Sequence, residues 1–152
     1  MIEDILKIKD PTTAIIELDE YLNRKSNYGE KINSLSDPEK VVLFIENLER
    51  EINNGGFNQF YFNSSGNYAN ETYESLIKIG AIQTAKIVLK ANNEWPNSNV
   101  TKNWSDRQDL LLKIESKSET TWNECDQEFY EYNDDIVTLL FEYVKENKNA
   151  FY

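Results

Sequence analysis

Two adjacent glycines, Gly55 and Gly56, interrupt a stretch of sequence that otherwise has the apolar spacing of an α-helix. Glycine has no Cβ, so it adopts the left-handed backbone conformation that closes a helix C-terminus at little cost. The helix before the pair is therefore predicted to end at Asn54-Gly55. This feature constrains the chain to at least two helical pieces that meet at a corner.

The helix before the corner has a complete start signal. Ser36 can accept a hydrogen bond as the N-cap residue, Pro38 suits the first turn, and Glu39 can return a hydrogen bond to the cap. Apolar residues then recur at helical spacing. They are Val41, Phe44, Ile45, Leu48 and Ile52. This segment is the clearest helix in the sequence.

The piece after the corner is also predicted to be helical, because Phe57, Phe60 and Tyr61 lie at i, i+3 and i+4. The segment Ser64-Ser65-Gly66 is expected to end it. A β-hairpin is the competing interpretation, since Asn-Gly between apolar runs is a strong hairpin signal. The helical periodicity of the residues before the glycines favours two helices instead.

Helical patterns also fill the rest of the chain, and strand-like alternation is scarce. The predicted helices run from Pro11 to about Arg24, from Asn70 to Gly80, from Ile82 toward Trp95, from Ser105 through Ile114, from Trp122 through Phe129 and from Ile136 through Val144. We therefore predict an all-α fold in which residues 1–152 form a single compact domain of about seven or eight helices.

The charge balance limits the classes of partner. The chain has 16 basic and 27 acidic residues, no histidine and a formal net charge of −11. Such a field repels nucleic acids and anionic lipids and attracts basic protein surfaces. We expect a basic protein as the partner, and neither direct nucleic-acid binding nor membrane binding.

The lack of histidine also limits chemistry, because no Ser-His-Asp triad, His-based zinc site or Glu-x-x-His di-iron motif can form. Cys125 is the single cysteine and has no histidine to activate it, so we expect a buried thiol in a reducing compartment. We expect no catalytic residue, no metal site and no cofactor. An acidic start and the lack of any apolar run of about 18 residues predict a cytoplasmic protein.

The last third of the chain is unusually acidic. Between Ser118 and Glu146, nine acidic residues occur against one basic residue, Lys145. A solvated face and an interface with a basic partner explain this block equally well. The candidate partner-binding residues are Glu124, Asp126, Glu128, Glu131, Asp134 and Asp135.

The simplest role for the corner is structural. The glycines would turn the chain, the aromatic residues would fill the core, and Asn53, Asn54, Gln59 and Asn63 would hydrogen-bond backbone groups of the two helix ends. No phosphate-binding glycine pattern is present. The residues assigned to this structural motif are Asn53, Asn54, Gly55, Gly56, Phe57, Gln59, Phe60, Asn63, Ser64, Ser65 and Gly66.

The segment from Glu51 to Gly66, followed by Ile79-Gly80-Ala81, resembles the bacterial domain-of-unknown-function family that includes DNA-mimic protein nineteen. The resemblance covers about residues 38–144. It implies an all-helical, cytoplasmic protein that is often dimeric and has no known catalytic activity. In the named member, acidic side chains imitate DNA phosphates on the DNA-binding face of a transcription factor. The corner motif does not specify which carboxylates would do this.

Three functional hypotheses follow. The leading one is a non-enzymatic acidic domain that binds a basic protein, with DNA mimicry on a DNA-binding protein as its specific form. The alternative is an immunity or antitoxin-like protein that neutralises a basic nuclease. The third is a carboxylate-based or metal-dependent hydrolase, for which Glu46, Glu49 and Glu51 are neighbouring acids on the second predicted helix.

Overall fold

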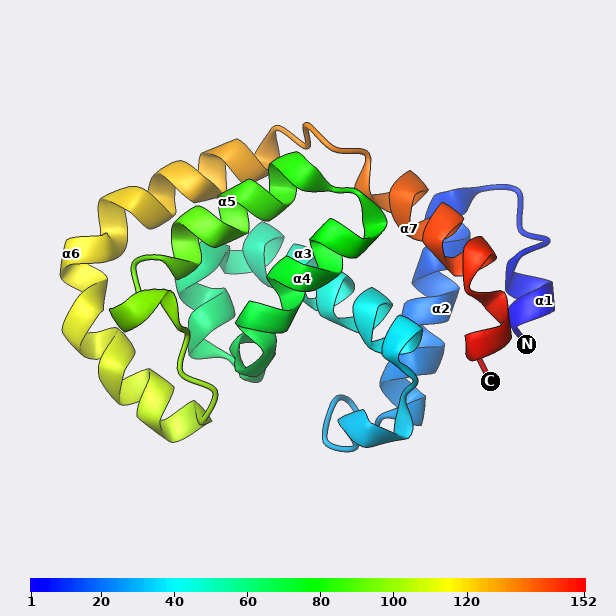
Figure 1. The fold of residues 1–152 in the computed structure, drawn as a ribbon, viewed down its shortest axis with the longest axis horizontal. Coiled ribbons are helices and arrows are strands. Elements are labelled where there is room, and N and C mark those ends of the chain that lie inside the picture. Colours follow the sequence, from blue (N-terminus) through cyan, green and yellow to red (C-terminus); the bar gives the residue numbers. More distant parts are fainter.

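A computed structural model describes residues 1–152, and it contains helices and no strands (Figure 1). The seven α-helices are α1 (Ile2–Ile5), α2 (Pro11–Lys25), α3 (Asp37–Phe62), α4 (Ala69–Ile79), α5 (Ile82–Asn92), α6 (Trp104–Tyr130) and α7 (Ile136–Glu146). Four short 3-10 segments lie between or after them: η1 (Ile32–Ser34), η2 (Ser64–Tyr68), η3 (Pro96–Ser98) and η4 (Lys148–Ala150). The predicted all-α fold is confirmed.

Helix α3 runs through the centre of the molecule, and the other helices pack around it (Figure 1). Helix α6 arcs along one side and packs directly on α3, while α4 packs on α3 and α5 packs on α4 and α6. Helix α2 packs with α7 at the opposite end. Both chain termini lie at that end. A continuous core of 35 buried residues extends from Ile5 to Phe151.

The start of α3 has the predicted capping geometry. The Ser36 hydroxyl accepts the N–H of Glu39 at 3.3 Å, and the Glu39 carboxylate accepts the N–H of Ser36 at 2.9 Å. Glu39 is fully buried, and it also forms an ion pair with Lys25 of α2 at 2.8 Å. One carboxylate therefore caps α3 and ties it to α2.

Helix α6 differs from the prediction, because the two helices expected around Ile114 and Trp122 are one helix of 27 residues. The polar stretch between them contains no glycine or proline, and the buried Ser118 continues the buried stripe from Ile114 to Trp122. The helix also starts earlier than predicted. Its N-cap is Asn103, whose side chain accepts the N–H of Asp106, and Ser105 lies inside the first turn.

None of the helices combines the length and the apolar composition needed to cross a membrane.

Candidate functional site

The corner between the two parts of α3 lies at Gly56, one residue beyond the predicted helix end. Gly56 has φ 79° and ψ −174°, and the residues on both sides of it are helical. The N–H of Phe57, freed by this break, donates to the Asp126 carboxylate of α6 at 2.8 Å. A Cβ at position 56 would collide with that carboxylate. Gly56 is therefore needed both for its backbone conformation and for the close approach of α6.

The amide side chains of the corner bond to other side chains, whereas the sequence predicted bonds to the backbone of helix ends. Glu51 accepts the amide groups of Gln59 at 2.8 Å and Asn63 at 2.9 Å, and Asn53 donates to the Tyr132 hydroxyl at 2.7 Å. Asn54 is exposed and its side chain forms no hydrogen bond within the chain. The N–H of Phe57, which is free at the break, bonds to Asp126 and not to a corner amide, because α6 brings this carboxylate to it.

The far end of the corner is held by Arg107, which was not among the residues predicted for the motif. Its buried guanidinium donates to the carbonyls of Tyr61 at 2.7 Å and Asn63 at 2.9 Å, where α3 ends. A Cβ on Gly66 would lie 2.9 Å from the Arg107 Nε, so the last motif glycine gives this side chain its space. Burial lowers the pKa of Arg107 to about 10. The sequence did contain a signal for this role, because Arg107 lies at helical spacing from Leu111 and Ile114 and so falls on the buried stripe of α6.

Five of the six acids predicted to bind a partner either cap a helix or pair with a neighbouring helix. Glu124 and Glu128 both pair with Lys90 of α5, at 3.2 and 3.0 Å. Asp126 caps the second part of α3, as described above. These three side chains link α6 to its neighbouring helices.

Asp134 and Asp135 cap helices as well. Asp134 accepts the N–H and the hydroxyl of Thr84 in the first turn of α5, at 2.7 and 2.9 Å, and α5 has no cap from its own N-cap residue. Asp135 is the N-cap residue of α7. Glu131 is exposed and accepts only from the nearby Asn133, at 3.3 Å, so it alone of the six has no contact outside its own loop.

A different group of carboxylates lines a cleft between α2, α3 and the loop that leads into α7. This acidic cleft has a volume of about 470 Å³, and no lysine or arginine lines it. Its polar lining residues include Glu46, Glu49, Tyr132, Asp134 and Asp135, and its apolar walls include Ile16, Ile136 and Val137. From the sequence, Glu46 and Glu49 were candidates only for a hydrolase, because their proximity to the α7 loop depends on the tertiary fold.

Glu46 and Glu49 both line the acidic cleft, and their surroundings disfavour negative charge. Burial and the charges of Glu49 and Asp19 raise the pKa of Glu46 well above its usual range. Burial also raises the pKa of Glu49, although the Tyr132 hydroxyl bonds to it and opposes the shift. Arg50 is the neighbouring cation, but it pairs with Asp19. The pair therefore holds a proton at neutral pH.

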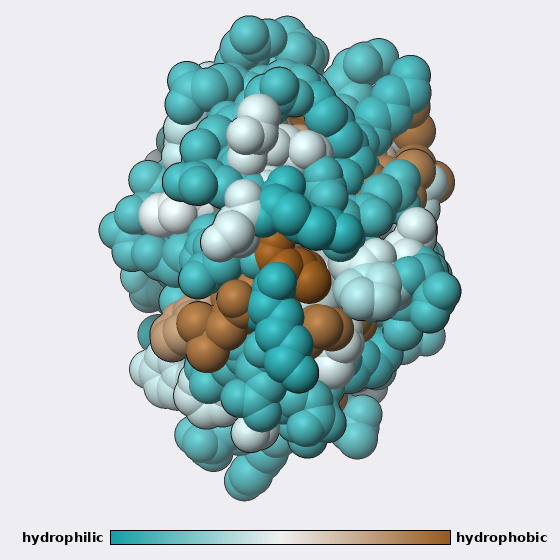
Figure 2. Space-filling model, turned by 90° about the vertical axis from the view of Figure 1, so that its left-hand side faces the viewer, coloured by the Kyte–Doolittle hydropathy of each residue, from teal (hydrophilic) through white to brown (hydrophobic).

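A second hollow without basic residues lies where the corner meets α6. This corner groove has a volume of about 400 Å³, and its lining includes Gly55, Asn58, Glu115, Glu119 and Asp126. Figure 2 views the molecule from the side on which α6 lies in Figure 1, and this face is mostly hydrophilic with a small group of hydrophobic side chains near its middle. The corner thus has carboxylate-lined hollows on two sides, since Asn53 bonds to Tyr132 of the acidic cleft.

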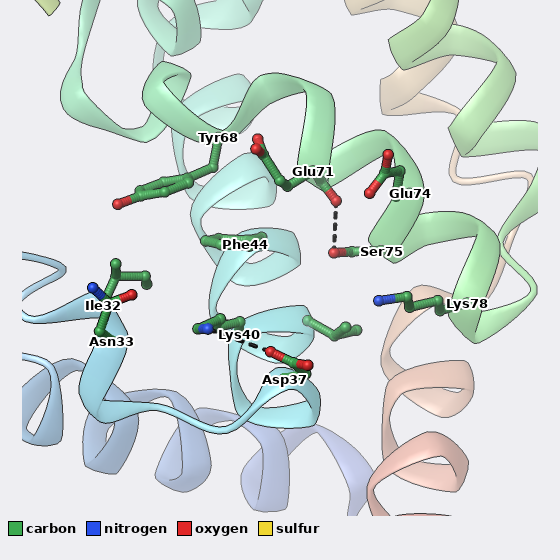
Figure 3. A pocket seen from close by; sticks show the side chains of 11 residues that line it. Ile32, Asn33, Asp37, Lys40, Phe44, Tyr68, Glu71, Glu74, Ser75 and Lys78 are labelled. Atoms are coloured by element: carbon green, nitrogen blue, oxygen red, sulfur yellow. Dashed lines mark hydrogen bonds and ion pairs between the residues drawn. The ribbon is translucent and has the colours of Figure 1, made fainter. Parts of the chain in front are cut away.

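The pocket between α3 and α4 has a different character (Figure 3). Lys40 and Lys78 face it together with acidic residues, and Lys40 pairs with Asp37 at 3.3 Å. Its volume is about 340 Å³. The chain contains no cluster of three or more histidine, cysteine or acidic side chains arranged to hold a metal ion.

A family model described as DMP19-like protein matches residues 33–147. The match contains the corner and helices α3 to α7, and it confirms the resemblance found in the sequence. No curated protein and no solved structure matches the chain.

Proposed function

The chain belongs to the DMP19-like protein family, and from this premise we propose that it binds a basic protein through carboxylates that take the places of DNA phosphates. The family relationship supports binding of this kind. The net charge of −11 supports a basic partner, because it favours encounter with positively charged surfaces.

The observation that carries the proposal is the absence of basic residues from the two hollows beside the corner. The chain has 16 lysines and arginines, and several of them neutralise carboxylates elsewhere, as Lys90 does for Glu124 and Glu128. None lines the acidic cleft or the corner groove. A partner could therefore supply the missing positive charges.

The proposed contact residues differ in part from those predicted from sequence. Glu131 and Asp135 stay in the set, because Glu131 is exposed and bonds only to the nearby Asn133, and Asp135 lines the acidic cleft. Glu124, Asp126, Glu128 and Asp134 contribute to the negative field, but their bonds within the chain give them a positioning role. The added residues, from the two hollows, are Glu46, Glu49, Glu115 and Glu119.

The acidic cleft is suited to a lysine or arginine side chain. Its apolar walls would contact the aliphatic stem, and its carboxylates would contact the charged end. A cation beside Glu46 and Glu49 favours their ionised forms, so the proton held by the pair would be released on binding. Calorimetry in buffers of different ionisation enthalpy should therefore show proton release when the partner binds.

Partner capture from a bacterial lysate at low and high salt tests the proposal. We compare the chain with a variant that carries Glu115→Lys, Glu119→Lys and Glu131→Lys, all at proposed contacts. The control carries Glu74→Lys, Asp109→Lys and Glu146→Lys, which reverse exposed acids without ion pairs outside both hollows. We expect a basic protein to be retained at low salt by the chain and the control, and lost with the first variant. Equal loss from both variants, or no retained basic protein, would contradict the proposal.

Competition with duplex DNA distinguishes imitation of DNA phosphates from other kinds of binding by acidic residues. If the carboxylates occupy a DNA-binding face, added duplex DNA should release the captured partner in proportion to its own affinity for that partner. Release by salt alone, with no effect of DNA at the same ionic strength, would exclude mimicry. The identity of the captured protein also tests the alternative hypothesis, because a captured nuclease would indicate an immunity-like role.

A further inference from the structure

A third hollow, which we call the hydroxyl pocket, lies between α3, η2 and the loop after α2. It has a volume of about 310 Å³, which is at the lower end of the range for small-molecule sites. Its lining includes Ser64 and Ser65 of the corner motif, together with Asn47, Asn67, Glu51 and Tyr28. Neither acidic hollow uses these residues.

The polar atoms of this pocket are only partly used by the protein. The hydroxyls of Ser64 and Ser65 form no hydrogen bond within the chain. Asn67 accepts from Arg107 at 2.8 Å through its oxygen, and Asn47 accepts from Arg50 in the same way, so the NH2 group of each amide remains free. Glu51 uses one carboxylate oxygen for two corner amides and leaves the other free.

These free groups mix donors with acceptors. The amide NH2 groups donate, the free oxygen of Glu51 accepts, and the serine hydroxyls can do both. A ligand hydroxyl also donates and accepts, so several hydroxyls on one ligand would match such a set. A ligand with only acceptors, or only donors, would leave part of the set without a partner.

The charges around the pocket disfavour an anionic ligand. Arg50 is the one basic residue that lines it, and Arg50 pairs with Asp19 of α2. Glu30 and Glu51 also line the pocket, so an anion such as phosphate would meet uncompensated negative charge.

Aromatic side chains border the pocket and provide apolar contact. Tyr28 is 76% exposed, and its ring is free to cover a ligand. Phe44 and Tyr68 stack with their ring centroids 4.7 Å apart and line both this pocket and the one in Figure 3. In that view the Tyr68 ring extends away from Glu74 and Lys78. C–H faces of a sugar ring pack well on such aromatic surfaces, whereas a simple polyol lacks them.

We propose that the hydroxyl pocket binds a neutral saccharide of one or two rings. The Ser64-Ser65 pair of the corner motif then has a ligand-binding role that is separate from the carboxylate-mediated binding of a basic protein.

Amide NMR titration of the full chain tests this inference, with glucose, maltose and N-acetylglucosamine as probes and inorganic phosphate as the charged comparison. We expect at least one saccharide to shift the signals of Ser64, Ser65 and Asn67 in a saturable way, and phosphate to leave them unchanged. The double variant Ser64→Ala, Ser65→Ala should bind that saccharide about tenfold more weakly, since two hydrogen bonds of roughly 0.7 kcal/mol each are lost.

The control is Ser116→Ala, which removes a serine hydroxyl at the corner groove and should leave saccharide affinity unchanged. Loss of affinity in the control equal to that in the double variant would overturn the inference. No saturable shift with any of the three saccharides, or tighter binding of phosphate, would overturn it as well. Partner capture by the double variant should be normal, so failure here is distinguishable from failure of the proposed function.

Discussion

At the scale of single residues, Gly56 meets two requirements, a positive φ and a close contact with Asp126, and comparison of two alanine variants can separate them. Gly56→Ala would place a Cβ on a residue with φ 79° and against the Asp126 carboxylate. We expect urea unfolding to show a loss of about 2–4 kcal/mol, from backbone strain together with the weakened bond to Phe57. Gly80→Ala is the matched control, because Gly80 has φ 82° but nothing within 4 Å of its added Cβ. A similar loss in both variants would mean that the contact with Asp126 contributes nothing.

Glu46 allows a prediction about pH. Its pKa is raised in the fold, so the folded chain holds this proton at pH values where the unfolded chain has lost it. The stability contributed by this group is complete below the unfolded pKa and falls as pH rises toward the folded pKa. Near neutral pH the buried pair therefore lowers stability relative to acid conditions.

Glu46→Gln replaces the acid with a neutral amide of the same shape and removes this dependence. We expect the variant to match the parent at about pH 4 and to gain on it by up to about 1.4 kcal/mol for each pH unit as pH rises to about 8.5, measured by urea unfolding. The control Glu74→Gln, at an exposed position, should follow the parent at both pH values. A stability difference for Glu46→Gln that does not change with pH would contradict the shifted pKa.

At the scale of elements, local signals in the sequence predicted most helix boundaries. The capping box at Ser36, the apolar stripe of α3 and the glycine at the end of α4 are each complete within a few residues, so no tertiary contact was needed to find them. The prediction failed in α6, where the polar residue Ser118 lies on the buried stripe that joins the two predicted helices into one.

The candidate site was less predictable than the helices, because it depends on contacts between helices that are far apart in the sequence. The acidic residues of the last third were visible in the sequence, but whether a carboxylate is free depends on which helix lies opposite. Asp126 meets Phe57, and Asp134 meets Thr84, across 69 and 50 positions of sequence. Glu46 and Glu49 show the opposite case. They were not predicted to bind a partner, and they become part of a cleft only because the loop before α7 lies beside them in the fold.

Asp134 gives a prediction about one element. It supplies the cap that α5 does not provide for itself, so Asp134→Ala should destabilise the chain by about 1–2 kcal/mol. Hydrogen exchange should accelerate most at Thr84 and its neighbours in the first turn of α5. Glu131→Ala, three residues earlier, should have almost no effect on either measurement, because Glu131 has no contact outside its own loop. Equal destabilisation by the two variants would refute the capping role.

At the scale of the whole molecule, stability and binding should respond to salt in opposite directions. A net charge of −11 on 152 residues favours the expanded chain through self-repulsion, and salt screens that repulsion. Raising the sodium chloride concentration from low ionic strength should therefore raise the Tm of the free chain. The same change should weaken capture of a basic partner, because it screens the attraction between the two surfaces.

The opposite responses of Tm and partner capture to salt distinguish electrostatic screening from a general effect of salt on the fold. If salt reduced capture by unfolding the chain, Tm and partner retention would fall together. The variant with Glu115→Lys, Glu119→Lys and Glu131→Lys has six fewer units of negative charge, so its Tm should depend less on salt. The control with Glu74→Lys, Asp109→Lys and Glu146→Lys has the same net charge and should show the same reduced dependence while it retains the partner. Tm then reports total charge, and only retention reports where the charge lies.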